Sequence, residues 1–254
     1  MGIDPLIDVH AHISTSSYPD INTVLERAKS AGVEKIITCT TDPSEFLMAK
    51  ELISTYPGFI YLTLGFDPAI LSEDKYVEFQ SILSSHLQLI TGIGEVGLDH
   101  YYIRDDLQRR IQEKFFRASI RVANSTGLPL VIHSRSAGKK TLEVLHSEGA
   151  KRVLMHAFDG KASDALEASK KGFYFSIPAS VVYSEQKQKM VKLLPLEAMM
   201  LETDSPVLSP IRGERNEPAN IIFSAKKISE IKNIPIKKVI EVTSSNALDL
   251  FQFK

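Results

Sequence analysis

The stretch Ile7-Asp8-Val9-His10-Ala11-His12 decides the fold of this chain, because it leads from a β-branched apolar run directly into two histidines. Side chains along a strand alternate between its two faces, so Asp8, His10 and His12 are predicted to share one face. Two neighbouring imidazoles at the end of a buried strand favour a divalent metal site. The remaining ligands of such a site are expected at the ends of other strands.

Residues with metal-binding side chains follow short apolar runs at four further points: Glu95, His133, His156 and Asp204. Together with the first motif they supply four imidazoles and two carboxylates. This donor set suits one or two divalent cations and includes no thiolate. Any one of these residues alone is interpreted more simply as an ordinary polar residue at a strand end. Six in the same context favour a metal site.

Apolar, β-branched runs alternate with amphipathic stretches along the chain, and Gly or Pro often separates them. The predicted strands are Ile3–Val9, Lys35–Thr40, Phe59–Leu64, Ile90–Ile93, Leu130–His133, Arg152–Met155, Phe173–Ser176 and Ala198–Leu201. The predicted helices are Asn22–Ser30, Ser44–Ser54, Tyr76–Gln88, Leu107–Ser125, Ala137–Glu148, Ala162–Lys170, Glu185–Leu194, Ala219–Lys232 and Ile236–Leu250. This alternation predicts a parallel sheet covered by helices.

The length of 254 residues fits a single domain covering residues 1–254, and a (β/α)8 TIM barrel has about this length. An open doubly wound sheet could carry the same alternation. However, the candidate ligands follow the first, fourth, fifth, sixth and eighth strands. Only a closed barrel brings all these strand ends to one mouth. We therefore expect an α/β fold, a TIM barrel with extra C-terminal helices.

The composition is that of an ordinary globular protein, with 43% hydrophobic and 24% charged residues and a net charge of −1. Nothing global marks a nucleic-acid or membrane binder, so DNA binding would have to come from a local basic patch. Cys39 is the single cysteine, and its apolar surroundings predict a buried thiol. The sequence shows no signal-like or membrane-length apolar segment, which predicts a cytoplasmic protein.

Six motifs occur in a fixed order along the chain. They are Ile7-Asp8-Val9-His10-Ala11-His12, Gly92-Ile93-Gly94-Glu95-Val96-Gly97-Leu98-Asp99, Leu128-Pro129-Leu130-Val131-Ile132-His133-Ser134-Arg135, Leu201-Glu202-Thr203-Asp204-Ser205-Pro206, Arg212-Gly213-Glu214-Arg215-Asn216-Glu217-Pro218-Ala219-Asn220 and Ser245-Asn246-Ala247-Leu248-Asp249-Leu250-Phe251. In this order they resemble the TatD family of metal-dependent hydrolases, which have DNase activity and belong to the amidohydrolase superfamily. A lone His-x-His motif is weak, whereas the ordered set is highly specific.

The resemblance implies one metal ion bound by four residues: His10, His12, Glu95 and Asp204. It also implies that Glu95 bridges to a second ion bound by His133 and His156. Glu95 and Asp204 would then be catalytic, because a bridging carboxylate holds two cations close together and Asp204 could orient or deprotonate a water. A structural alternative is that Asp204 caps a turn. The metal could be zinc, manganese, cobalt, iron or, less readily, magnesium.

Two positions depart from the family pattern. Asp67 in Gly65-Phe66-Asp67-Pro68 replaces the family's usual histidine, and Asp159 falls where the family usually has serine. An acid near the mouth disfavours a phosphate substrate, so Asp67 is predicted to influence substrate binding. Either aspartate could instead be a turn residue, and for Asp159 this is at least as good an interpretation.

Arg135 directly follows His133 and is predicted to bind a substrate phosphate, because its planar guanidinium matches phosphate oxygens in pairs. Other basic residues could extend the rim, although solvated helix faces explain most of them as well: Arg104, Arg109, Arg110, Lys139 and Lys140. Asp8 and Glu202 are predicted to support the ligands by hydrogen bonds.

The leading hypothesis is a metal-dependent deoxyribonuclease that hydrolyses phosphodiester bonds, with DNA as its partner and no obligate protein partner. A second hypothesis keeps the metals and changes the substrate to an ester or amide, such as an aminoacyl ester on tRNA or a small cyclic amide. A third is a catalytically silent barrel that binds a partner. The complete ligand set argues against the third hypothesis.

Overall fold

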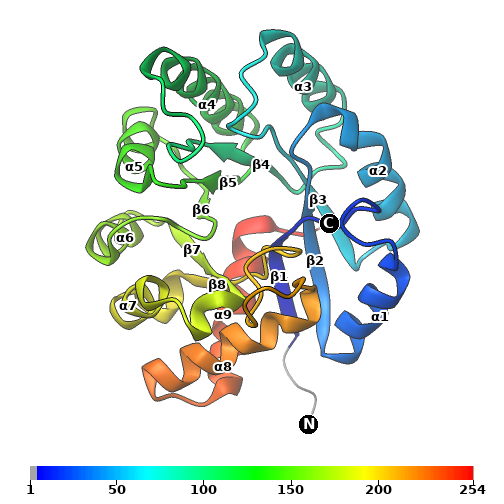
Figure 1. Cartoon of the computed structure of the whole chain (residues 1–254), viewed down its shortest axis with the longest axis vertical. Coiled ribbons are helices and arrows are strands. Elements are labelled where there is room, and N and C mark those ends of the chain that lie inside the picture. The colour runs from blue at the N-terminus through cyan, green and yellow to red at the C-terminus, as the bar shows by residue number, and fades with distance from the viewer. Residues whose placement is uncertain (1–4, 254) are drawn as a thin grey trace.

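The structure, a computed structural model, describes residues 5–253. Within this range one parallel sheet of eight strands follows the order of the chain from β1 to β8. The strands are β1 (Leu6–Ala11), β2 (Val33–Cys39), β3 (Ile60–Leu64), β4 (Gly92–Gly97), β5 (Leu130–His133), β6 (Val153–Met155), β7 (Tyr174–Ile177) and β8 (Met199–Leu201). Figure 1 shows them around a centre, with helices outside them. The predicted TIM-barrel architecture is confirmed.

The helices alternate with the strands as predicted, and two more follow the eighth strand. They are α1 (Ile21–Ser30), α2 (Phe46–Thr55), α3 (Glu73–Ser85), α4 (Asp106–Thr126), α5 (Gly138–Ser147), α6 (Ala162–Ser169), α7 (Glu185–Leu193), α8 (Ile221–Lys232) and α9 (Ile236–Phe251). Most predicted boundaries lie within three residues of the observed ones. The predicted start of the first strand, Ile3, lies outside the described residues.

The largest displacement is at β4, which was predicted over Ile90–Ile93 and extends from Gly92 to Gly97. Its glycines disfavour a strand by propensity. Close approach to β5 nevertheless requires them, because a Cβ at Gly97 would lie 2.0 Å from the carbonyl oxygen of His133. Tertiary packing therefore overrides propensity here, and it carries Glu95 into the barrel mouth.

The two ends of the sheet meet at the mouth, where the segment after β8 bonds to β1. The backbone N–H of Asp204 donates to the carbonyl of His10 at 2.9 Å, and that of His12 donates to the carbonyl of Ser205 at 2.7 Å. The Asp8 carboxylate accepts bonds from the N–H of Thr203 at 2.9 Å and from its hydroxyl at 2.6 Å. This seam fixes Asp204 beside both histidines of β1.

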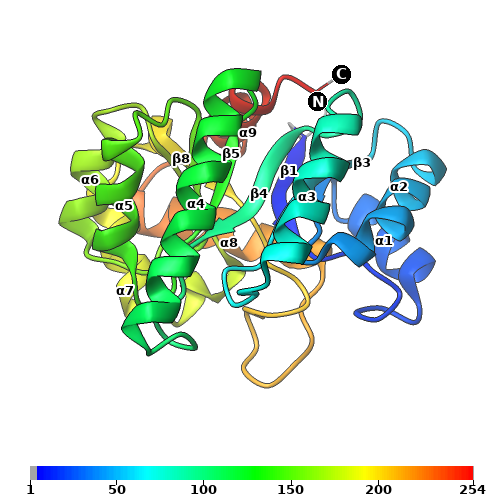
Figure 2. The ribbon, with the colours of Figure 1, turned by 90° about the horizontal axis from the view of Figure 1, so that it is seen from above.

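Apolar side chains form two separate cores. The larger one lies between the sheet and the surrounding helices. The smaller one fills the barrel interior with Ile7, Val9, Ile37, Val131, Leu154 and Met200, against Ala247, Leu250 and Phe251 of α9. Figure 2 shows α9 and the loop after β8 on opposite sides of the barrel. Because α9 closes one end, the polar site lies at the other.

A bulge in β1 overturns one detail of the sequence analysis. The register of β1 against β2 slips between Asp8 and Ala11. Val9 packs in the interior core, whereas Ala11 packs in the outer core, although strict alternation would put both on one face. The prediction that Asp8 shares a face with His10 and His12 is therefore wrong. The bulge turns the histidines inward and leaves Asp8 facing the seam.

The contact between β4 and β5 gives a stability prediction. Gly97→Ala should lower the free energy of unfolding by about 3 kcal/mol, because the added Cβ meets backbone that has little freedom to move. Gly127→Ala is the matched control: it also replaces a glycine of positive φ, but its Cβ would meet nothing within 4 Å. The control should cost about 1 kcal/mol in urea unfolding. Equal losses would contradict the packing argument.

Candidate metal centre

All six predicted ligand residues lie together at the C-terminal mouth of the barrel. They come from the ends of five strands: His10 and His12 at β1, Glu95 in β4, His133 ending β5, His156 after β6 and Asp204 after β8. Three overlapping groups of their donor atoms lie close enough to hold a metal ion. Glu95 belongs to two of these groups and connects the two halves of the site.

The first group surrounds Oε2 of Glu95. This oxygen lies 3.5 Å from Nε2 of His10 and 3.6 Å from Nε2 of His12. Oδ1 of Asp204 lies 3.5 and 3.4 Å from the same two nitrogens. Donor atoms about 2.1 Å from a tetrahedral metal ion lie about 3.4 Å from one another. These four nitrogen–oxygen spacings therefore fit donors arranged around a cation better than direct hydrogen bonds.

His10 provides a second indication that the group fits a cation. Its side chain is completely buried, and neither of its ring nitrogens has a hydrogen-bond partner. Buried polar atoms in proteins are nearly always paired, so an orphaned imidazole needs an explanation. A cation between Glu95 and Asp204 would supply the partner for Nε2 of His10.

The second group surrounds Oε1 of Glu95. This oxygen lies 3.4 Å from Nε2 of His156 and in direct contact with Nδ1 of His133. Nδ1 of His156 lies 3.0 Å from Oε2 of Glu202, so it can donate to that carboxylate and leave Nε2 free. For a cation to enter this group, His133 and Glu95 must move apart.

The carboxylates and imidazoles of the site stabilise one another's charged forms. Burial opposes ionisation of Glu95, but the imidazoles of His133 and His156 outweigh it and hold the pKa of Glu95 well below its usual range. Asp204 behaves likewise, its pKa lowered by His156 against the effect of burial. Burial disfavours the charge on His133, yet Glu95 and Asp99 raise its pKa to about 9. The carboxylates thus create a negative field that favours cations, whether protons or metal ions.

Sequence analysis missed Asp99, which supports His133. Its Oδ2 lies 2.9 Å from Nε2 of His133, while its Oδ1 accepts bonds from the backbone N–H groups of Tyr101 and Tyr102. A carboxylate behind a metal-binding histidine fixes its ring orientation. The sequence did contain a signal for this role. Asp99 follows Glu95 by four residues, and an even spacing along extended backbone places two side chains on the same face.

Lys187 was also missed, because no local pattern marks it. Its ammonium group is buried and donates to the carbonyls of Ala157 at 2.7 Å and Phe158 at 2.6 Å. Ala157 has a φ of +35°, a strained value for a residue with a side chain. Glu202 accepts the N–H of the same residue at 2.8 Å. Lys187 and Glu202 therefore hold the turn that presents His156.

Arg135, predicted to bind substrate, lies exposed on the rim after β5. Its guanidinium carbon is 4.3 Å from the ring centre of Tyr101 and 4.9 Å from that of Tyr102. Asp67 is half-buried, and burial, with the charges of Glu95 and Asp99, raises the pKa of its carboxyl. Its Oδ1 also accepts the N–H of Ala69 at 2.7 Å. This hydrogen bond agrees with the turn interpretation of Asp67, and its substrate role stays a prediction.

Three of the remaining polar positions have structural partners. Asp159 accepts the backbone N–H of Ser136 at 2.7 Å and so connects the loops after β5 and β6. Lys140 pairs with Glu113 at 2.9 Å, and Arg109 donates to the carbonyl of Ile103 at 2.9 Å. These contacts agree with the structural interpretation of those residues.

A parallel barrel with histidines and carboxylates gathered at the mouth defines a metal-dependent hydrolase, in which the protein fixes the ligands and a cation activates water. The family model described as "TatD related DNase" matches residues 7–252. The chain belongs to this family. The expected resemblance is confirmed over nearly its whole length.

Individual proteins similar to this chain support the same family assignment. The chain is 40% identical to deoxyribonuclease TATDN3 of Homo sapiens, over 97% of this chain and 94% of that protein. It is 36% identical to the uncharacterized metal-dependent hydrolase YabD of Bacillus subtilis, over 97% of this chain and 99% of the relative. The crystal structure of YJJV, a TatD homolog from Escherichia coli k12, aligns with this chain over the full length of both, with a TM-score of 0.89 and 25% identity.

Among the described helices, none has the length and apolar character needed to cross a membrane.

The buried ammonium of Lys187 predicts a pH dependence of stability. Burial lowers its pKa from 10.5 to about 8, so between these values the unfolded chain holds a proton that the folded chain has lost. The free energy of unfolding should therefore rise with pH across this window, by about 3 kcal/mol relative to the Lys187→Met variant. Urea unfolding at several pH values measures the difference.

Lys189→Met is the matched control, because Lys189 lies exposed on the same helix. This variant should keep the rise shown by the unaltered protein. Parallel pH profiles for the protein and Lys187→Met would contradict the lowered pKa of Lys187.

Proposed function

We propose that the chain is a deoxyribonuclease that uses two divalent cations. The proposed ligands of one cation are His10, His12, Glu95 and Asp204, and those of the other are Glu95, His133 and His156. The observation that carries the proposal is that the two oxygens of Glu95 face different histidines. Oε2 faces His10 and His12, and Oε1 faces His133 and His156. A carboxylate so placed can bridge two ions.

Bound cations would lower the pKa of a water and offset the charge of the attacking and leaving oxygens. The residues of the chain supply the remaining steps. Glu95 holds the two halves of the site together, and Asp204 accepts the proton of the attacking water. Glu202 and Asp99 fix the rings of His156 and His133 through hydrogen bonds. Arg135 binds a non-bridging phosphate oxygen and reduces the charge that develops there.

Two observations support DNA as the substrate. One relative with high coverage is named a deoxyribonuclease. In addition, Arg135 lies over Tyr101 and Tyr102, which are 47% and 63% exposed. A cation beside exposed aromatic rings suits nucleic acid, because phosphates bind the charge while bases stack on the rings. Arg135 thus supplies a local positive charge for DNA binding, which the net charge of −1 does not provide.

Asp67 favours a second candidate, an esterase or amidohydrolase such as an aminoacyl-tRNA deacylase. The carboxyl of Asp67 is close enough to Glu95, His133 and Asp99 for their charges to shift its pKa. A carboxylate there would repel a phosphate but not a neutral ester.

As part of the proposal, residues 1–254 act as one domain in the cytoplasm without an obligate protein partner.

The ligand assignment predicts metal contents. Glu95→Ala should lose both cations, because each group loses a donor, whereas His133→Ala should lose only the second cation. The metal affinity of each site that loses a ligand should fall by about tenfold or more. Even removal of a residue that only hydrogen-bonds to a ligand lowers metal affinity by about this factor. Elemental analysis after dialysis measures the stoichiometry.

His146→Ala is the control, because His146 lies on α5 and packs against Phe173 away from the mouth. It should keep the metal content of the unaltered protein. An unchanged metal content in Glu95→Ala would refute the bridging assignment.

The substrate is tested by comparing single-stranded DNA with an aminoacyl ester at saturating metal. The protein should hydrolyse DNA faster. Arg135→Ala should raise KM for DNA by about tenfold, the effect expected for one hydrogen bond to a charged group, and leave the ester unaffected. Arg135→Lys should restore part of the loss, because it keeps the charge without the planar fork.

Asp67→His, measured on the same two substrates, should speed DNA hydrolysis alone, because it removes a repulsive charge near the phosphate. An equal gain on both substrates would place Asp67 away from the phosphate. Faster hydrolysis of the ester than of DNA by the unaltered protein would favour the second candidate.

A further inference from the structure

Tyr18 lies in the segment between β1 and α1, and its side chain is completely buried, although Pro19 and Asp20 directly after it are exposed. Its hydroxyl donates to the backbone carbonyl of Asn216 at 2.8 Å, across 198 positions of the chain. Burial raises the pKa of this hydroxyl, so it stays protonated and remains a donor. Tyr18 therefore joins the segment after β1 to the loop after β8. The function proposed above makes no use of this contact.

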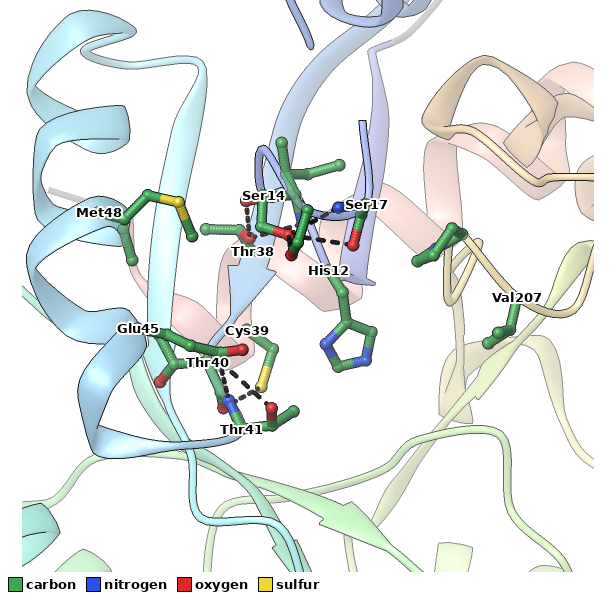
Figure 3. Close-up of a pocket in the computed structure, with 14 residues that line it drawn as sticks. His12, Ser14, Ser17, Thr38, Cys39, Thr40, Thr41, Glu45, Met48 and Val207 are labelled. Carbon is green, nitrogen blue, oxygen red and sulfur yellow. Dashed lines mark hydrogen bonds between the residues drawn. The ribbon is translucent and has the colours of Figure 1, made fainter. Parts of the chain in front are cut away.

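On one side of this contact, a compact turn leads back from Tyr18 to His12. The carbonyl of Ser14 accepts the N–H of Tyr18 at 2.8 Å, and the hydroxyl of Ser14 accepts the N–H of Ser17 at 3.1 Å. Figure 3 shows Ser14 and Ser17 joined by dashed lines close to His12. Because these bonds close the turn, a shift of Tyr18 would move the backbone that carries His12.

On the other side of the contact, Asn216 leads to Asp204. The side-chain amide of Asn216 donates to the carbonyls of Thr203 and Val207, both at 2.8 Å, and these two residues lie on either side of Asp204. Asp204 has a φ of +53°, which is unfavourable for a residue with a side chain. Such a conformation persists only where the surrounding structure holds it. The placement of Asp204 therefore depends on Asn216.

Two ion pairs join the same segments at the surface. Arg27 on α1 donates to Glu217 at 2.9 Å, and Arg215 donates to Asp20 at 3.0 Å. The side chains of Arg27, Arg215 and Asp20 are 42–43% exposed, and ion pairs at such positions contribute little to stability. A completely buried hydrogen bond is not weakened by solvent in this way. The hydroxyl of Tyr18 is therefore the contact whose loss should matter most.

We propose that Tyr18 is a positioning residue that holds the segment of His12 against the loop of Asp204 and thereby sets the affinity of one cation separately from the other. The inference rests on the ligand assignment proposed above, in which His12 and Asp204 bind the first cation and His133 and His156 bind the second. Without the hydroxyl, the two segments would hold the binding arrangement in only a fraction of the molecules. Apparent affinity for the first cation falls in proportion to that fraction.

The test is a manganese titration of the metal-free protein, followed by equilibrium dialysis and by the electron paramagnetic resonance signal of the bound ion. His133→Ala isolates the first cation, and His10→Ala isolates the second. Adding Tyr18→Phe to His133→Ala should weaken manganese binding about fivefold, the factor that corresponds to one neutral hydrogen bond. Adding Tyr18→Phe to His10→Ala should change the affinity for manganese by less than about twofold, because neither His12 nor Asp204 binds the second cation.

Tyr76→Phe is the matched control. Tyr76 is a buried tyrosine on α3, and its hydroxyl donates to the carbonyl of Phe115 at 3.0 Å, away from the metal centre. In urea unfolding without metal, Tyr18→Phe and Tyr76→Phe should lower the free energy of unfolding by similar amounts, since each loses a buried hydrogen bond. Only Tyr18→Phe should weaken binding of the first cation.

An unaltered affinity for the first cation in Tyr18→Phe would overturn the inference and leave the proposed function intact. Equal losses of affinity in Tyr18→Phe and Tyr76→Phe would also overturn it, because the effect would then be a general loss of stability. So would equal losses at both cations in Tyr18→Phe. If the unaltered protein bound no manganese at all, the proposed function would fail, and the inference with it.

Discussion

The carboxylate of Glu95 is the group on which the rest of the site depends. It is buried in the barrel mouth, and its two oxygens face different groups of imidazoles. Burying a charge is unfavourable unless it is compensated, so this carboxylate requires several cationic or donor partners around it. His133 and His156 provide part of that compensation, as the strongly lowered pKa of Glu95 shows. The same concentration of negative charge and free nitrogens is what a divalent cation needs.

Further residues hold this arrangement without belonging to it. Asp99 and Glu202 orient His133 and His156, and Lys187 fixes the strained turn at Ala157. On the other side, Asn216 is buried and donates to the carbonyls of Thr203 and Val207 at 2.8 Å, which holds the loop that carries Asp204. These contacts come from distant parts of the chain. Precise placement of the ligands is thus a property of the closed barrel rather than of any one motif.

Much of the fold and site could be predicted from the sequence, because both have short-range signals. Strand and helix periodicities predicted a parallel sheet covered by helices. The candidate ligands each follow an apolar run, and their distribution over five strands favoured a closed barrel. The failures have physical causes. The bulge in β1 depends on register against β2, so Asp8 was placed on the wrong face. β4 was displaced because its glycines serve contact with β5 rather than a turn. Lys187 acts across the fold, and nothing near it in sequence reveals its partners.

The most direct test of the central claim is a crystal structure of the protein loaded with manganese, with the ions located by anomalous scattering. Two peaks are expected, one on each side of the Glu95 carboxylate, with each of its oxygens about 2.0–2.2 Å from one ion. The peak near Oε2 should be completed by His10, His12 and Asp204, and the other by His133 and His156. Ions bound elsewhere, or a Glu95 side chain turned away from both, would contradict the account.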